Sequence, residues 1–356
     1  MYVTMLGIAG SGKTSYMAGL YEAHAADAIK GFGIEPTSTN SNIVDDVLAL
    51  GDFGSISFRG TKFTFPAGTQ QTTLWQFNLL QGSSIVTTFH WIDYRGGILT
   101  DTSAEIRNDP RKLQELKELA VHIQFTNAVL ILVDSIALTK FEDIREARSR
   151  SGADKIGSLM LQIDKAFPNR NLTYVLVLTK ADAVEEKWKQ SNYDLLVKRG
   201  LDSFERFIEY GKTKPMWTGG IVPVSAVGEN NAETKITLPK SLQDDMTVVS
   251  VLKRMPTPMN VGDALFFAVG QTLKRDAEAL KMDRAKQQEE MIEILKKTNW
   301  ARSLWAKITK KPTPEEIVAT LLEQQQANTT RLQQFEGFIK PLLDSAKKNV
   351  RLIQGW

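Results

Sequence analysis

The chain has 356 residues, of which 42% are hydrophobic and 24% are charged, and its formal net charge is +3. This length predicts about two domains, or one domain with a large extension, in a globular protein of ordinary composition. The small net charge gives no indication of nucleic-acid binding, and the lack of cysteine excludes disulfides, thiolate catalysis and cysteine–zinc sites. With only three histidines in the chain, we do not expect a histidine-based metal site either.

Hydropathy gives no sign of a membrane span or a secretory signal. The longest apolar stretches, such as "AVLILV", are far shorter than the ~20 residues that a spanning helix needs. The N-terminus has no basic segment followed by an apolar run, which a signal peptide would require. We therefore expect an intracellular, cytoplasmic protein.

The first motif lies between a predicted buried strand over residues 2–8 and a segment of helical character that begins at Lys13. Its sequence, "GIAGSGKT", matches the pattern G-x-x-x-x-G-K-[ST]. Glycines there let backbone N–H groups approach a polyphosphate, while Lys13 would reach the β- and γ-phosphates and the Thr14 hydroxyl would coordinate Mg²⁺. A flexible turn is the simpler explanation, but the strand–loop–helix context favours a phosphate-binding loop. The residues predicted to contact nucleotide are Gly7, Gly10, Ser11, Gly12, Lys13, Thr14 and Ser15.

A second group of residues follows a long insertion over residues 30–70, which mixes Gly, Pro, Ser and Thr with short β-like runs. The segments "TLWQFNLLQ" and "SIVTTFHWI" flank the turn "QGSS" and predict a hairpin. Asp93 ends the second of these strands, and Gly96 follows at the spacing D-x-x-G. Asp93 would hold Mg²⁺ through water, and the Gly96 N–H would bind the γ-phosphate. This motif is weak alone, because Asp and Gly are common in turns, and its position in the chain is what gives it weight.

The middle of the chain alternates strands and helices. The runs "NAVLILVDS" and "LTYVLVLT" are apolar throughout, as expected for strands buried on both faces of a parallel sheet, and "GGIVPVSAV" is a candidate for the last strand. Helices are predicted near 111–124, 154–166 and 184–210. The pattern predicts a three-layer α/β fold with a mostly parallel sheet, in which ligands bind at the carboxyl ends of the strands.

The residues that we expect to recognise the base lie at the carboxyl ends of predicted strands. In "LTKAD", Thr179, Lys180 and Asp182 follow a strand, and a carboxylate there can accept the N1–H and N2–H of guanine, a pair that adenine does not offer. Lys180 could pack over the ring, and Ser225 and Ala226 could meet guanine O6 through backbone groups. A solvated turn is the simpler explanation of "TKAD" alone. Asp134 also ends a strand, but we prefer Asp93 as the magnesium acid because it alone has a downstream glycine.

Beyond about residue 261 we expect the strands to stop and two long helices to follow. The second has a clear start, with Thr313 as N-cap and Pro314 at the first helical position. Between the helices, residues 296–311 ("KKTNWARSLWAKITKK") are basic, and Trp300, Leu304, Trp305 and Ile308 stand there at near-helical spacing. Such a segment either lies on an anionic membrane or acidic partner, or packs its tryptophans against the protein's own helices, which is the commoner case.

Taken in order, these motifs resemble the five motifs of a P-loop GTPase of the translation-factor-related (TRAFAC), Ras-like class, over roughly residues 1–275. The combination of "IDYRGG" and "TLWQF" is similar to the bacterial modules described as double-GTPase partners. The resemblance implies binding of GTP or GDP with Mg²⁺, and two switch loops that grip the γ-phosphate. It also implies a protein partner, a second GTPase or a GTPase-activating protein, and homo- or hetero-dimerisation.

The resemblance further implies a magnesium-binding threonine in the first switch loop, for which Thr72 is best placed, with Thr69 and Thr73 as competitors. The second loop would begin at residue 94. Gly97 stands where Ras-like enzymes carry the glutamine that orients water, so hydrolysis would be slow or would use another group. Arg95 is a candidate for stabilising charge in cis, although a surface arginine is the simpler explanation.

Three functions remain open on the sequence. The first is a GTP-binding switch with slow or partner-stimulated hydrolysis, formed by residues 1–275 and followed by a helical extension over 276–356. The second is a nucleotide-locked pseudo-GTPase that acts as an interaction module. The third is a P-loop ATPase or nucleotide kinase, in which "TKAD" is accidental.

Overall fold

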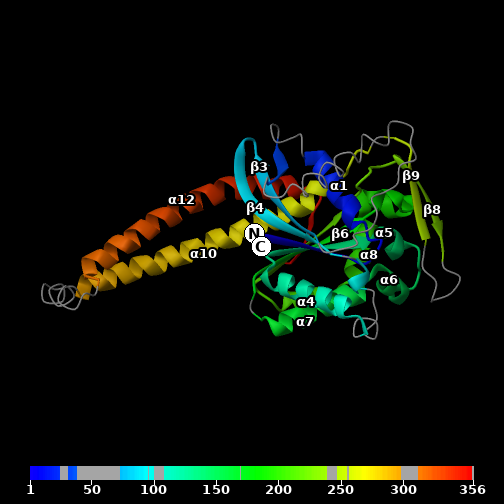
Figure 1. The fold of residues 1–356 in the computed structure, drawn as a ribbon. Coiled ribbons are helices and arrows are strands. Elements are labelled where there is room, and N and C mark those ends of the chain that lie inside the picture. Colours follow the sequence, from blue (N-terminus) through cyan, green and yellow to red (C-terminus); the bar gives the residue numbers. More distant parts are fainter. Residues whose placement is uncertain are drawn as a thin grey trace. The chain divides into compact units, whose positions relative to one another are not determined.

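The computed structural model describes residues 1–24, 31–37, 73–94, 96–99, 108–168, 170–238, 247–254, 256–297 and 312–354. These divide into two compact units: residues 1–269 with 345–356, and residues 270–344. The predicted fold class is confirmed, because the structure has a large, mostly parallel sheet between helices and long helices toward the C-terminus (Figure 1).

The first unit contains the large sheet, whose strand order is β10-β7-β6-β5-β1-β4-β3-β2. The central strands β1, β4, β5, β6 and β7 run parallel, whereas β2 and β3 at one edge and β10 at the other are antiparallel to their neighbours. A separate two-stranded sheet pairs β8 with β9. The strands are β1 (Tyr2–Leu6), β2 (Phe32–Pro36), β3 (Thr73–Gln81), β4 (Ser84–Asp93), β5 (Ala128–Asp134), β6 (Leu172–Thr179), β7 (Trp217–Pro223), β8 (Ala232–Thr237), β9 (Thr247–Leu252) and β10 (Arg351–Gln354).

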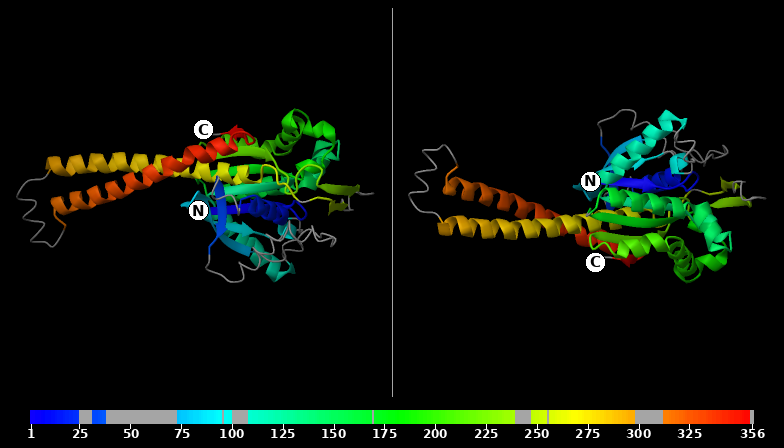
Figure 2. Two further views of the ribbon diagram at one scale, coloured as in Figure 1. Left: turned by 90° about the horizontal axis from the view of Figure 1, so that it is seen from above. Right: turned by 90° about the horizontal axis from the view of Figure 1, so that it is seen from below.

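Helices cover both faces of this sheet because its central strands are apolar on both sides. Every residue of β5 and β6 is buried, and alternate residues such as Val129 and Leu130 point to opposite faces. One face packs against α4, α7, α8 and α9, and the other packs against α1 and the first turns of α10 (Figures 1 and 2). The helices of this unit are α1 (Lys13–His24), α4 (Pro110–Phe125), α5 (Ser135–Thr139), α6 (Ile144–Ser151), α7 (Ala153–Ala166), α8 (Glu186–Ser203) and α9 (Glu205–Lys212), with short 3-10 helices η2 (Gly96–Leu99) and η3 (Ala181–Ala183).

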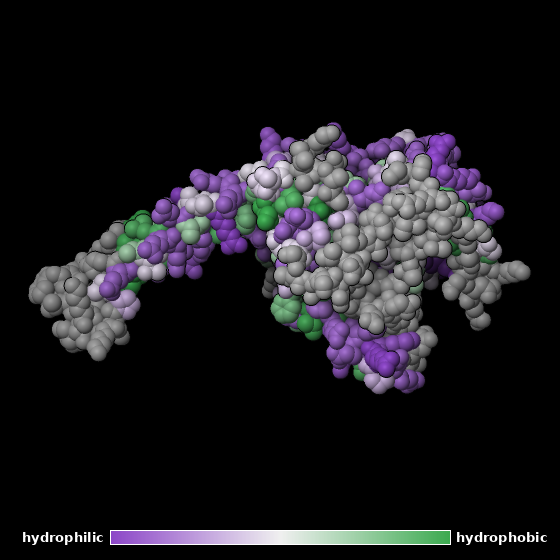
Figure 3. Space-filling view, turned by 45° about the horizontal axis from the view of Figure 1, so that its top comes forward, coloured by the Kyte–Doolittle hydropathy of each residue, from purple (hydrophilic) through white to green (hydrophobic). Residues whose placement is uncertain are grey.

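The second unit is an antiparallel pair of helices, the greater parts of α10 (Val261–Lys297) and α12 (Pro314–Ala346). The expected start of α12 is correct, since Thr313 Oγ1 accepts from Glu316 N at 3.2 Å while Glu316 Oε2 accepts from Thr313 N at 2.7 Å. An ion pair of 2.7 Å joins Lys281 to Glu336 across the pair. The space-filling view shows mostly hydrophilic residues on this unit, interrupted by hydrophobic ones (Figure 3). Met282 is one exposed hydrophobic residue of this unit. Most of the basic tryptophan segment, residues 298–311, lies outside the described residues, so its two interpretations stay predictions.

Several elements differ from the expectations. Strands do not stop near residue 261, because β10 follows α12 and pairs with β7 as an antiparallel edge strand. "GGIVPVSAV" is therefore not the last strand. The helix expected over 184–210 is two helices, α8 and α9, and α8 contains a left-handed turn. Four residues of β10 are too few to show strand periodicity, and the turn in α8 contains no glycine to mark it.

Candidate functional site

The loop between β1 and α1 is built around glycine. Gly10 and Gly12 have φ angles of 75° and 86°, which L-residues rarely adopt. A Cβ atom at Gly7 would lie 2.9 Å from the Leu132 carbonyl oxygen, so no larger residue fits there without a shift. Ser11 N donates to Ile8 O at 3.2 Å and closes the turn. The loop therefore has the tight, bare backbone that phosphate binding at the N-terminus of a helix requires.

Lys13 begins α1 and folds back over this loop. Its Nζ donates to Gly7 O at 2.8 Å and to Ile8 O at 3.1 Å, and its side chain is buried. Thr14 and Ser15 are half-buried in the first turn of the same helix. The Ser11 hydroxyl is buried and has no hydrogen-bond partner within the described residues. The arrangement places an ammonium group, hydroxyl groups and a helix N-terminus at one short loop, a suitable donor set for phosphate and Mg²⁺.

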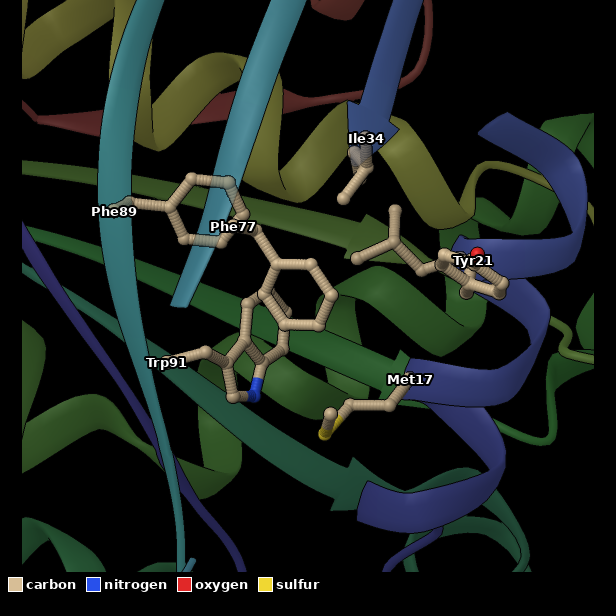
Figure 4. Close-up of a pocket in the computed structure, with 7 residues that line it drawn as sticks. Met17, Tyr21, Ile34, Phe77, Phe89 and Trp91 are labelled. Carbon is tan, nitrogen blue, oxygen red and sulfur yellow. The ribbon is translucent and has the colours of Figure 1, made fainter. Parts of the chain in front are cut away.

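An apolar cluster holds α1 against the strands that lead to the second predicted motif. Side chains from α1, β2, β3 and β4 gather there around a small cavity (Figure 4). The lining is apolar, which suits an anchor for the helix and does not suit a charged ligand. The lining residues are Met17, Leu20, Tyr21, Ile34, Phe77, Phe89 and Trp91.

The segment that follows β6 is tied directly to the loop. The Thr179 hydroxyl lies 2.7 Å from Ser11 O and 3.1 Å from Val133 O, in a buried position. Lys180 has a left-handed backbone with φ of 56°, and its Nζ donates to Gly10 O at 2.7 Å. Two neighbouring residues of "TKAD" thus hold two neighbouring carbonyls of the phosphate-binding candidate. The predicted phosphate and base segments are therefore in direct contact.

Asp134 completes this connection. One carboxylate oxygen caps α5 by accepting from Ile136 N at 2.8 Å and Ala137 N at 3.3 Å, and the other lies 2.6 Å from Lys180 Nζ. Both oxygens of the buried Asp134 carboxylate therefore have partners within the chain. The preference for Asp93 as the magnesium acid stays a prediction. The sequence placed Asp134 at the end of a strand but gave no signal that it would pair with Lys180.

Asp182 lies in η3, mostly buried, and forms a hydrogen bond with Ser225. Burial raises the pKa of the Asp182 carboxyl, and the hydrogen bond with Ser225 acts in the opposite direction. Ser225 Oγ also accepts from Val227 N at 3.2 Å and Gly228 N at 2.7 Å, which fixes the hydroxyl as a donor to the carboxylate. The loop after β7 therefore orients the acid that we expect to read the base.

The loop after β7 also reaches the helix that follows the glycine loop. A Cβ atom on Gly19 would lie 3.0 Å from Ala226 Cα, so the backbone of α1 packs tightly against this loop at Gly19. Ser225 is buried and Ala226 is half-buried. Ala226, one of the two residues that were predicted to meet guanine O6, thus lies directly beside α1.

The magnesium and switch candidates are only partly described. Asp93 ends β4, whose residue Ile92 pairs with Thr4 of β1, so Asp93 and Gly7 leave the sheet at the same edge. Gly96 begins η2, and Gly97 follows within it. The side chain of Asp93 lies outside the described residues, as do Arg95, Thr69 and Thr72. Their roles stay predictions. None of the described helices is long and apolar enough to cross a membrane.

No protein-family model and no curated protein matches the chain. The similar solved structures include a dimerization-deficient mutant of Toc33 from Arabidopsis thaliana, at 15% identity and a TM-score of 0.34, covering 64% of this chain and 71% of that one. They also include the signal recognition particle receptor SRb-GTP/SRX complex from Chaetomium thermophilum, at 14% identity and a TM-score of 0.30, covering 65% of this chain and 95% of that one. Likenesses at this level carry no conclusion about what this chain binds, which depends on the site's own geometry.

Proposed function

We propose that the chain is a P-loop GTPase that binds GTP and GDP with Mg²⁺ and acts as a switch. One observation carries this proposal: Thr179 and Lys180 are anchored on the carbonyls of Ser11 and Gly10, so that the glycine loop and Asp182 form a single site. A phosphate-binding loop alone is compatible with any nucleotide. A mostly buried carboxylate beside it favours a base that offers two adjacent N–H donors, and guanine is that base.

In this proposal each end of the nucleotide has its own set of residues. The loop from Gly7 to Ser15 holds the phosphates, with Lys13 as the cation, and the segments at Thr179 and Ser225 enclose the base. Mg²⁺ would be held by Thr14, by Asp93 through water and by the switch threonine, for which Thr72 is the first candidate. Bound Mg²⁺ would offset phosphate charge, as in other P-loop proteins.

Hydrolysis would be slow or partner-assisted. Gly97 follows Gly96 at the position where a water-orienting side chain would stand, and glycine has none. A catalytic group must then come from elsewhere, either from Arg95 or from a protein partner such as a second GTPase or a GTPase-activating protein. The same glycine supports a second candidate function, a nucleotide-locked pseudo-GTPase. Phosphate release in a single turnover separates the two, since the locked form releases none with or without partner.

Binding is tested by titrating the purified protein with fluorescent GDP and ADP in the presence of Mg²⁺. We expect binding of GDP, weak or undetectable binding of ADP, and loss of GDP binding in Lys13→Ala. Lys212→Ala is the matched control, because Lys212 forms an exposed ion pair with Glu209 in α9. Unchanged GDP affinity in Lys13→Ala would overturn the proposal, and equal affinity for ADP would favour the ATPase alternative.

A further inference from the structure

Helix α8 contains an unusual turn close to the base-reading segment. After Gln190 in an extended conformation, Ser191, Asn192 and Tyr193 have φ angles of 51°, 56° and 66°. Each of these residues has a Cβ atom, and left-handed helical backbone costs such residues roughly 1–2 kcal/mol apiece. A run of three requires other contacts to hold it, and strain of this kind gathers at functional sites.

The C-terminal strand supplies one of those contacts. Arg351 of β10 donates from Nη2 to Asn192 O at 2.5 Å, and its Nη1 forms an ion pair with Asp194. The guanidinium group thus holds the carbonyl of one left-handed residue and the side chain just beyond the turn. A planar, charged fork suits this task better than an ammonium group, because it donates along two directions at once.

The turn directs Tyr193 toward the base site. Tyr193 is 6% exposed, and its hydroxyl donates to Glu229 Oε1 at 2.8 Å. Glu229 directly follows Gly228, whose N–H is bound by Ser225, the partner of Asp182. Burial raises the pKa of the Asp182 carboxyl, and the charge of Glu229 raises it further. Burial and the bond to Glu229 raise the pKa of the Tyr193 hydroxyl, which therefore remains a donor.

We propose that Tyr193 is a positioning residue for base recognition, which holds Glu229 in place so that the Asp182 carboxylate stays directed at the base. Arg351 acts one step further out, by holding the left-handed turn that presents Tyr193. The inference rests on the proposed function and extends it to residues that lie outside the five motifs. Neither Tyr193 nor Arg351 needs to touch the nucleotide.

The test compares GDP with IDP, whose base lacks the 2-amino group. The ratio of their affinities measures how well Asp182 receives the N2–H, and general loosening of the fold changes both affinities together. In Tyr193→Phe we expect GDP affinity to fall by about fivefold to tenfold, the usual effect of losing one hydrogen bond, with a smaller change for IDP. The GDP/IDP ratio should therefore fall. Arg351→Gln should lower the ratio in the same direction.

Two variants serve as controls. Tyr210→Phe removes a matched hydroxyl, which donates to Asp164 Oδ2 at 2.7 Å near the start of β6, at the opposite end of that strand from Asp182, and should keep the wild-type ratio. Glu229→Gln keeps an acceptor for Tyr193 and should give a ratio no lower than wild type. An unchanged ratio in Tyr193→Phe, or an equal fall in Tyr210→Phe, would overturn this inference alone. If the wild-type protein binds neither nucleotide, or does not prefer GDP, the proposed function itself fails.

Discussion

The bond between Thr179 and the glycine loop gives the sharpest single test of how the site is assembled. Thr179→Val keeps the shape of the side chain but removes the hydroxyl that lies 2.7 Å from Ser11 O. Thr179 faces Gly12, where an added Cβ would lie 3.6 Å from both the Cβ and the Oγ1 of Thr179, an ordinary contact distance. Valine places a methyl group where the hydroxyl stood, so the space beside Gly12 stays filled. The change therefore removes a hydrogen bond with little change in packing.

The expected magnitude follows from burial. Thr179 is 4% exposed, so the Ser11 carbonyl loses a donor where water does not readily replace it. Such a loss costs roughly 1–3 kcal/mol. Part of it falls on the loop conformation that binds phosphate, so we expect nucleotide affinity to drop by about tenfold, which corresponds to about 1.4 kcal/mol.

Titration calorimetry with GDP measures the effect on Thr179→Val. Thr329→Val in α12 is the matched control, since its hydroxyl also donates to a backbone carbonyl at 2.7 Å, that of Gln325. We expect the control to bind GDP like the wild type. If Thr179→Val folds normally and binds GDP with unchanged affinity, the two segments do not depend on this bond and the reasoning is refuted.

Three further changes probe other parts of the site. Gly12→Ala should weaken GDP binding by about fivefold, because alanine is strained at a φ of 86°; wild-type affinity by calorimetry would contradict this. As the pH is lowered, GDP affinity should begin to fall at a higher pH than the ordinary aspartate pKa of 3.8 predicts. Burial raises the pKa of Asp182, and only its ionised form accepts both base protons. Asp182→Asn should remove that pH dependence and favour xanthine nucleotides, and guanine preference that persists in a titration would count against the assignment. Asp134→Asn should lower GDP affinity by about fivefold, because Lys180 loses its ion pair. Lys140→Ala is the control and should bind GDP like the wild type, since its ion pair with Glu185 is more exposed.

The sequence predicts those parts of the fold whose determinants are local. The central strands β5 and β6 could be predicted because a strand buried on both faces must be apolar throughout. The glycine loop could be predicted because its backbone needs residues without side chains at fixed positions. Thr179, Lys180 and Asp182 could be placed at a strand end by the same apolar run that precedes them.

The remaining features depend on contacts between distant segments. The left-handed turn at 191–193 has a sequence that is compatible with an ordinary helix, and Arg351 reaches it from more than 150 positions away. Strand β10 forms because β7 offers a free edge, which four residues cannot reveal on their own. The pairing of Asp134 with Lys180 depends likewise on β5 and β6 lying side by side, with Asp134 opposite Thr179.

The identity of the bound base tests the central claim most directly. Nucleotide-free protein is incubated with Mg²⁺ and an equimolar excess of GTP, ATP, CTP and UTP, separated from free nucleotide and denatured, and the released base is identified by chromatography. We predict that guanine nucleotide is released in clear excess over the other three. Release of adenine nucleotide, of all four without preference, or of none would contradict the account.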